Sequence, residues 1–160
     1  MADQAEMKEK FWKALKSDRT VMLGIHGAQH DKSQPMTALT LERESYLWFF
    51  TTKDNHLVED MRRDDRAMVT FASKGHDLFA TLDGRLEEEH DRTRIDQLWN
   101  PFAAAWFEGG KDDPKLQLIR LDPTSAQIWL NEHSSFAALK LLLGQDPKED
   151  YKDKVAEIAF

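Results

Sequence analysis

The residues most suited to binding a ligand form the run 51–56, Thr-Thr-Lys-Asp-Asn-His, between an aromatic segment and a predicted helix. The run brings hydroxyls, a cation, an amide and the free N–H groups of a helix that begins after Asn55 to one point of the chain. Anions bind at such points because unpaired backbone donors and the helix dipole point outward there. A capped helix with a polar approach explains the same residues, and taken alone they favour that simpler interpretation.

Aromatic side chains beside turns make up a second feature. Trp99-Asn100-Pro101 is followed by Trp106 and Phe107, just before the Gly109-Gly110 pair. Such residues suit a protein core, and they equally suit a subunit interface or a wall on which a planar ring stacks. A third feature, the run 73–76 (Ser-Lys-Gly-His), places a cation and an imidazole at the end of a strand, where a plain turn is the favoured interpretation.

The common catalytic signatures are absent from the chain. It contains no G-x-S-x-G elbow, no H-E-x-x-H helix, no P-loop and no G-x-G-x-x-G. Its six histidines are scattered and none is spaced as a metal pair, so no metal site is expected. The absence of cysteine excludes disulfides, thiolate ligands and thiol catalysis. No side chain is marked as a general acid or base, and catalytic residues are therefore left unassigned.

Composition limits the classes of partner and the cellular compartment that we expect for this protein. The 160 residues carry a formal net charge of −7, which disfavours nucleic acid and anionic membrane surfaces. The polar N-terminal segment resembles no signal peptide, and no apolar stretch reaches the ~20 residues that span a bilayer. We therefore expect a cytoplasmic protein. A hydrophobic fraction of 41% supplies an ample core for one domain.

Hydrophobic periodicity predicts the elements that must position these residues. A spacing of four between apolar residues indicates an amphipathic helix at 4–17. Apolar, alternating or aromatic runs predict strands at 20–25, 36–41, 46–51, 67–73, 77–82, 116–121 and 126–130, with a possible bulge at 82–85. Further helices are expected from Asn55 to Asp64, after Asp91, and from Ser134 or Ser135 through Leu143, before a charged tail that ends at Phe160.

Many short strands with short connections favour an antiparallel barrel over a parallel α/β sheet. The predicted fold is mainly β with flanking helices (α+β), a six- to seven-stranded antiparallel barrel in a single domain, 1–160. Within it we expect an N-terminal helix at 1–18, a barrel at 20–130 with two inserted helices, and a C-terminal helix and charged tail at 134–160. The large apolar residues Trp99, Phe102, Trp106 and Phe107 exceed what one small barrel covers, which predicts a homodimer.

Several runs between Gln34 and Leu130 carry a family resemblance. They are Pro35-Met36 at the start of a strand, 47–51 (Leu-Trp-Phe-Phe-Thr), 91–101 with its Leu-Trp-Asn-Pro end, and 105–114 (Ala-Trp-Phe-Glu-Gly-Gly-Lys-Asp-Asp-Pro), the most specific of the four. Together they resemble the general stress protein group of the pyridoxamine 5'-phosphate oxidase-like, FMN-binding split-barrel family.

The resemblance implies a split barrel that dimerises with two flavin sites at the subunit interface. The flavin phosphate would lie near the strand-to-helix junction, with the isoalloxazine ring between the subunits. Carried onto this chain, the FMN-binding residues would be Gln34, Met36, Thr37, Phe50, Thr51, Thr52, Lys53, Asn55, His56, Leu57 and Lys74, with Trp106 and Phe107 from the second subunit's wall.

The chain departs from the family pattern at two positions. The family often has Arg directly before Pro-Met, where this chain has Gln34, and commonly has Lys in the following helix, where this chain has Leu57. Both cations would neutralise a phosphate that carries a charge of about −1.5 to −2. Their loss predicts weaker FMN binding unless Lys53, His56 or Lys74 substitutes.

Three functions remain open from the sequence. The first is a stress-related, FMN-binding oxidoreductase of unknown substrate, in which the flavin does the redox chemistry. The second is a non-catalytic protein that binds flavin or another planar anion, and the third is a split barrel that has lost its cofactor. Pyridoxamine phosphate oxidase activity itself is not expected, because the tail at 148–160 offers no arginine for that substrate's phosphate.

Overall fold

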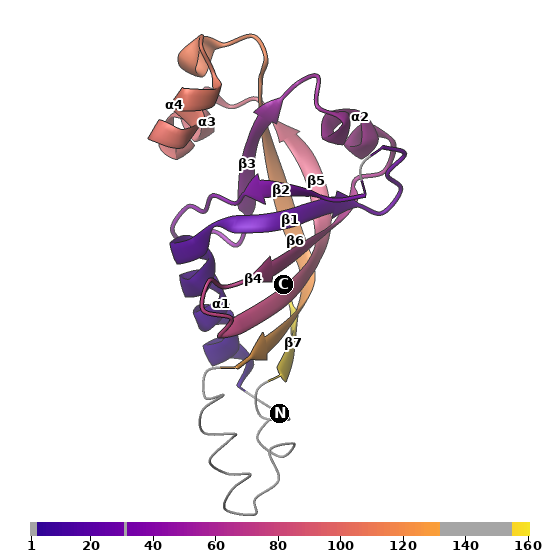
Figure 1. Ribbon diagram of the computed structural model, residues 1–160, viewed down its shortest axis with the longest axis vertical. Coiled ribbons are helices and arrows are strands. Elements are labelled where there is room, and N and C mark those ends of the chain that lie inside the picture. The colour runs from indigo at the N-terminus through magenta and orange to yellow at the C-terminus, as the bar shows by residue number, and fades with distance from the viewer. Residues whose placement is uncertain (1–2, 31, 132–154) are drawn as a thin grey trace, which may run out of the picture.

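A computed structural model describes residues 3–30, 32–131 and 155–160 of the chain. In these residues one curved antiparallel sheet forms the body of the molecule, and helices lie at its ends and along one flank (Figure 1). The elements are α1 (Gln4–Asp18), β1 (Thr20–Ile25), β2 (Gln34–Thr37), β3 (Leu47–Thr52), α2 (His56–Arg63), β4 (Arg66–Ala72), β5 (Leu78–Glu89), α3 (Arg92–Leu98), α4 (Pro101–Trp106), the 3-10 turn η1 (Gly110–Asp112), β6 (Leu116–Leu130) and β7 (Val155–Ala159).

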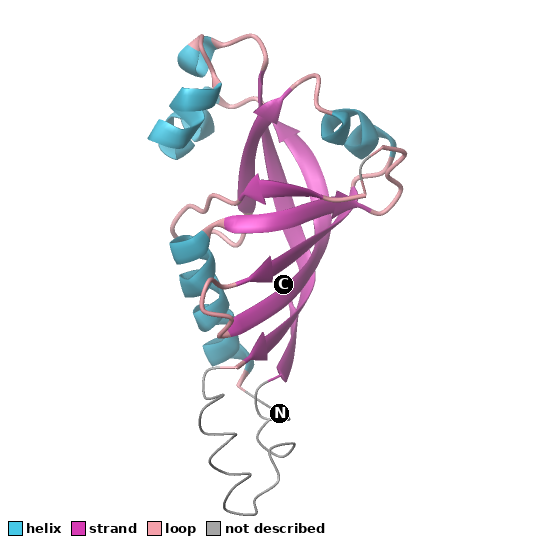
Figure 2. Ribbon diagram, in the orientation of Figure 1, coloured by secondary structure: helices cyan, strands magenta, loops and turns pink. Residues whose placement is uncertain are grey.

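The sheet has seven strands in the described residues, in the order β2-β1-β4-β5-β6-β3, with β7 also paired to β6. The long strand β6 pairs with β5 along its length, with β3 over its first half and with β7 over its second half. A two-residue bridge between Leu39 and Trp48 joins the chain after β2 to β3, so the two edges of the sheet meet. The seven strands and flanking helices, seen together in Figure 2, confirm the predicted antiparallel split barrel.

Alternating burial explains the strands. Along β5, Leu78, Ala80, Leu82 and Leu86 are buried, and most residues between them are exposed or half-buried. The predicted bulge is confirmed, because the register between β5 and β6 shifts at Asp83/Gly84. A Cβ on Gly84 would lie 2.6 Å from the backbone oxygen of Asp122, so the close approach of the strands requires glycine there.

Two apolar cores hold the molecule together. The larger fills the barrel and includes the stripe of α1, Met7, Phe11 and Leu15, as well as the buried face of α2. The smaller lies between the β3–β6 part of the sheet and the helices α3 and α4 and centres on Trp48, with Phe107 at its border. This second core positions α4 beside β3, and the candidate site lies at that border.

Besides the strand expected at 36–41, which in the structure is β2 (Gln34–Thr37) followed by the isolated Leu39 bridge, three predictions about the elements need correction. Strands at 116–121 and 126–130 were expected to be separate, but they form one strand, β6, because Pro123 lies opposite the bulged Gly84, where the ladder tolerates proline. Two inserted helices were expected between 20 and 130, whereas the structure has a third, α4, capped by Asn100 with Pro101 in its first turn.

The charged tail is the third correction. Its end forms the strand β7, which pairs with β6 from Ser125 to Trp129. The strand is stable because Ala156 and Ile158 are buried in the barrel core. The helix predicted to run through Leu143 lies outside the described residues.

Candidate functional site

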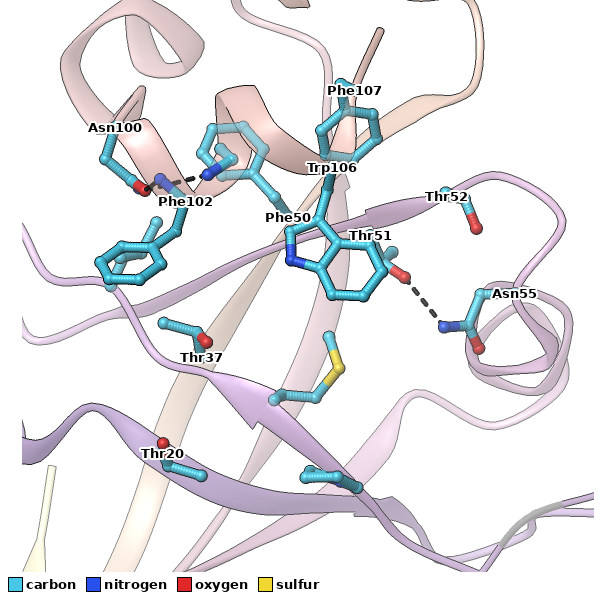
Figure 3. Close-up of a pocket in the computed structure, with 14 residues that line it drawn as sticks. Thr20, Thr37, Phe50, Thr51, Thr52, Asn55, Asn100, Phe102, Trp106 and Phe107 are labelled. Atoms are coloured by element: carbon cyan, nitrogen blue, oxygen red, sulfur yellow. Dashed lines mark hydrogen bonds between the residues drawn. The ribbon is translucent and has the colours of Figure 1, made fainter.

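A cleft of about 430 Å³ lies between α4 and the part of the sheet formed by β1, β2 and β3 (Figure 3). This size falls in the range of about 300–1,000 Å³ that is typical of small-molecule sites. Its lining consists of apolar and aromatic side chains, four threonines and two asparagines: Thr20, Pro35, Met36, Thr37, Leu39, Phe50, Thr51, Thr52, Asn55, Asn100, Phe102, Ala103, Trp106 and Phe107.

Asn55 organises the junction between β3 and α2. Its Oδ1 caps the helix by accepting a hydrogen bond from the Leu57 N–H at 2.9 Å, as predicted. Its Nδ2 donates to Thr51 Oγ1 at 2.9 Å and to Gln34 Oε1 at 3.2 Å, and Gln34 Nε2 donates back at 3.4 Å. The amide therefore ties β2, β3 and α2 together, and Gln34 is held at the edge of the cleft.

The approach to α2 carries an anion beside this junction. A hydrogen bond with Thr52 is the largest cause that lowers the pKa of Asp54, so this carboxyl stays ionised well into acid. Lys53 and Asp54 are both exposed, whereas Thr52 is half-buried and faces the cleft.

Aromatic rings form the floor and one wall of the cleft. Phe50 packs edge-on against Trp99, with ring centroids 5.7 Å apart, and against Phe107 at 6.5 Å. Phe107 is buried, whereas Phe102 and Trp106 are 78% and 83% exposed. Figure 3 shows the Trp106 indole reaching from α4 over the cleft, so an exposed planar surface is available to a ligand.

Polar contacts order the helices α3 and α4 beside the cleft. Asn100 Oδ1 accepts hydrogen bonds from the N–H groups of Phe102 and Ala103, both at 3.0 Å, and so caps α4 (Figure 3). Arg94 on α3 forms an ion pair with Glu44 and lies over the Trp48 ring, 5.6 Å from its centroid. These contacts hold α3 and α4 at a defined distance from β3.

A buried carboxylate lies on α2 behind the junction. The Asp60 side chain is 3% exposed, and its Oδ1 lies 3.1 Å from His30 Nδ1 and accepts from the Gln29 N–H at 3.4 Å and from Arg63. Burial raises the pKa of Asp60, but hydrogen bonds with His30, Gln29 and Arg63 outweigh it, and the net pKa is lowered. Asp60 thus anchors the connection between β1 and β2 to α2.

The predicted site residues divide into two groups. Those that line the cleft are Met36, Thr37, Phe50, Thr51, Thr52, Asn55, Trp106 and Phe107. The others lie outside its lining: Gln34 contacts Asn55, His56 stacks on His30 with centroids 4.0 Å apart, Leu57 is 4% exposed in the barrel core, Lys53 is exposed, and Lys74 lines a neighbouring cavity.

Six lining residues were not among the predicted ones: Thr20, Pro35, Leu39, Asn100, Phe102 and Ala103. Thr20 reaches the cleft because it pairs with Thr37 across β1 and β2, a register that no local pattern announces. Asn100 and Phe102 belong to the aromatic feature seen in the sequence, and its Asn-Pro helix start is the signal that could have placed them.

The lining is uncharged. None of its fourteen residues in the described chain is Lys, Arg, His, Asp or Glu. No group of three or more His, Cys, Asp or Glu residues suited to a metal ion occurs within the part of the chain that the structure describes. No helix in that part is long and apolar enough to cross a membrane. The cleft can therefore bind a planar, apolar group and donate hydrogen bonds, but it offers no acid or base of its own.

The fold and the cleft define an antiparallel split barrel with an aromatic ligand site between an inserted helix and the sheet edge. The model of the family described as "Pyridoxamine 5'-phosphate oxidase like" matches residues 6–145. The chain belongs to this family, as the sequence motifs predicted.

Solved structures similar to the chain include general stress proteins. The general stress FMN/FAD binding protein from Xanthomonas citri is 54% identical, with 81% of this chain and 92% of that chain covered and a TM-score of 0.75. General stress protein 26 from Jannaschia sp. CCS1 is 31% identical, with 99% and 100% covered and a TM-score of 0.84. Among curated proteins, the chain matches Protein bli-3 of Neurospora crassa at 25% identity over 88 residues, spanning 50% of this chain and 42% of that relative.

Proposed function

We propose that this protein binds FMN in the cleft between α4 and the β3–α2 junction, and that it works as a flavin-dependent oxidoreductase. The observation that carries the proposal is a cleft of suitable size whose wall is aromatic and whose opposite end presents hydroxyl and amide groups. The Xanthomonas citri relative, named as an FMN/FAD binding protein, supports the same ligand class.

The residues fit the flavin ring well. Phe107 offers a buried apolar surface and Phe50 a half-buried one, and the exposed Trp106 offers a second planar face. Aromatic rings stack on other planar rings in offset or edge-on arrangements, which contribute about 0.5–1.5 kcal/mol beyond the burial of area. A tricyclic ring would also cover Trp106, which is 83% exposed in the chain alone.

The end of the cleft at α2 offers the flavin phosphate uncharged hydrogen-bond donors. Thr52 offers a hydroxyl and α2 begins beside it, whereas the cleft lining has no cation. Lys53 carries the positive charge of the junction, and both Lys53 and His56 are exposed. We therefore expect the phosphate to add less affinity here than in a site with Arg or Lys in contact.

In this function the side chains bind and orient rather than transfer protons. Phe50, Phe107 and Trp106 hold the ring and exclude water from one face, and Thr51 and Asn55 fix the junction against β2. Bound flavin would supply the electron-transfer chemistry, since the lining contains no titratable side chain.

A second copy of the chain is expected to complete the site. Phe102 and Trp106 are 78% and 83% exposed, and they lie together on α4 at the mouth of the cleft. Large exposed aromatic residues on one surface are typical of interfaces. Light scattering at micromolar concentration should give the mass of a dimer, and a monomer mass that persists with FMN would contradict this part of the proposal.

A flavin titration tests the proposed function. FMN added to flavin-free protein should lose fluorescence on binding, and Trp106→Ala should weaken binding about tenfold, or roughly 1.4 kcal/mol. The matched control is Phe79→Ala, because Phe79 is an exposed aromatic residue outside the cleft lining. The proposal fails if FMN does not bind, or if both variants bind it as the wild type does.

Non-catalytic flavin binding is the second candidate function. It is favoured by the uncharged lining, which provides no proton donor or acceptor beside a substrate. Reduction of the bound flavin by NADH or NADPH, followed by reoxidation with an acceptor, separates the two: steady turnover supports the oxidoreductase, and binding without turnover supports a carrier or sensor.

A further inference from the structure

A second cavity, of about 610 Å³, adjoins the cleft at the end away from α2. The two share Thr20, Thr37, Leu39, Asn100 and Phe102, so they lie side by side. In Figure 3, Thr20, Thr37 and Phe102 lie on the opposite side of the view from Thr52 and Asn55. A ligand in the second cavity would therefore meet the ring end of a flavin whose phosphate lies at the junction.

We propose that this second cavity binds the substrate of the flavin, and that the substrate is a small organic acid whose carboxylate or phosphate is held by Arg19 and Lys74. The inference rests on the proposed function for the role of the ligand, whereas the existence of the site rests on the cavity itself. The first cleft has a neutral lining, and the second has two cations.

The two cations are available to a ligand. Within the described residues, neither the Arg19 guanidinium nor the Lys74 ammonium takes part in an ion pair. One carboxylate, Asp18, also lines the cavity, but its Oδ2 accepts a hydrogen bond from the backbone N–H of Lys74 at 2.8 Å. Counting Asp18 with Arg19 and Lys74, the three ionisable lining residues carry a formal charge of +1, which still favours an anion.

That same contact brings Arg19 and Lys74 to one cavity although they are far apart in the sequence. Asp18 ends α1, and it holds the turn between β4 and β5 against that end. Arg19 follows with a φ of 56°, and its carbonyl accepts from the Ala38 N–H at 2.7 Å, which fixes the backbone.

The remaining lining suits the rest of an organic acid. Trp99, Leu98, Pro101 and Phe102 supply apolar surface, and Gln97 and Asn100 supply amides. Arginine binds carboxylate or phosphate with two parallel hydrogen bonds, and lysine adds a point charge. An aromatic or unsaturated acid would thus place its charge at Arg19 and Lys74 and its planar part toward the flavin cleft.

Calorimetry with matched probes tests the inference. The probes are benzoate and phenyl phosphate, which are planar and anionic, and benzamide, which has the shape of benzoate without the charge. Flavin-free and FMN-loaded protein should both bind the anionic probes at least about tenfold more tightly than benzamide, a difference of roughly 1.4 kcal/mol. The double variant Arg19→Gln/Lys74→Gln should lose this preference for the anionic probes.

Lys13→Gln is the matched control, because it removes one charge from an exposed position of α1 outside both cavities. It should leave the preference for anions unchanged. The inference is wrong if neither anion binds at millimolar concentration, if benzamide binds equally well, or if the double variant behaves as the control does. Charge-dependent probe binding without FMN binding would support the anion site and overturn the flavin function, so the two failures are distinguishable.

Discussion

Replacing Gln34 by arginine should restore a phosphate-binding cation to the cleft. Gln34 is half-buried at the start of β2 and contacts Asn55, the residue that caps α2 beside the cleft. The change Gln34→Arg should therefore strengthen FMN binding while leaving riboflavin, which lacks the phosphate, nearly unaffected.

The magnitude follows from the contacts that are gained and lost. A hydrogen bond to a charged group contributes about 1.5–3 kcal/mol, and ordering a long side chain costs about 0.5–1.5 kcal/mol. The two amide contacts that Gln34 makes with Asn55 are long, at 3.2 and 3.4 Å, and an arginine can still donate to Asn55 Oδ1. The net gain should be about 1–2 kcal/mol, a factor of roughly 5–30 in FMN affinity.

Fluorescence titrations of FMN and riboflavin against wild type and variant measure this gain. The ratio of the two affinities should rise in Gln34→Arg, and the rise should shrink at high salt because exposed charges are screened. Gln34→Met, of similar length but without charge or amide, is the matched control and should not raise the ratio. An unchanged ratio in a folded arginine variant would refute the placement of the phosphate at this junction.

Three further predictions concern the parts that position the cleft. Leu57→Lys should lower the free energy of unfolding by at least about 3 kcal/mol in chemical denaturation, because this side chain is 4% exposed in the core. The control Leu57→Met should lower it by less than about 1.5 kcal/mol. Equal losses in the two variants would contradict the burial of Leu57. Asp60 has a lowered pKa in the folded protein, so its carboxylate contributes stability above the unfolded pKa of about 4, and this is lost as the pH falls through the folded pKa. The wild type should therefore exceed Asp60→Asn in stability at neutral pH by more than it does in acid, and a constant difference in urea melts across that range would contradict this. Asn100→Ala should lower the free energy of unfolding by about 1 kcal/mol because it removes the α4 cap, and it should weaken FMN binding. The control Asp91→Ala removes the cap of α3 and should lower stability by a similar amount. Identical FMN affinities in the two variants would argue against α4 as the wall of the cleft.

The fold could be predicted wherever local patterns decide the structure. Apolar, alternating and aromatic runs in the sequence located the strands. The capping residues Asn55 and Asp91 located two helix starts. Helix α4 was missed because six residues, Pro-Phe-Ala-Ala-Ala-Trp, are too few to show an amphipathic period. The strand β7 was missed because its pairing with β6 depends on a partner far away in the sequence.

The same limit applied to the site, because only residues that form a local motif could be predicted. The junction at 51–56 was found because hydroxyls, an amide and a helix start follow one another in the chain. Thr20 and Leu39 reach the cleft only through the pairing of β1 with β2 and the bridge to β3, which no short motif encodes. The side chain of Leu57 lies in the core together with Val58 and Met61, as the apolar spacing of this helix predicts, so the resemblance alone suggested that this position meets the flavin phosphate.

A crystal structure of the protein with FMN tests the central claim most directly. The flavin should lie in the cleft, with its ring against Phe50 and Phe107 and its phosphate toward Thr52 and the start of α2. Flavin bound at another surface, or a cleft without flavin in protein saturated with FMN, would contradict it.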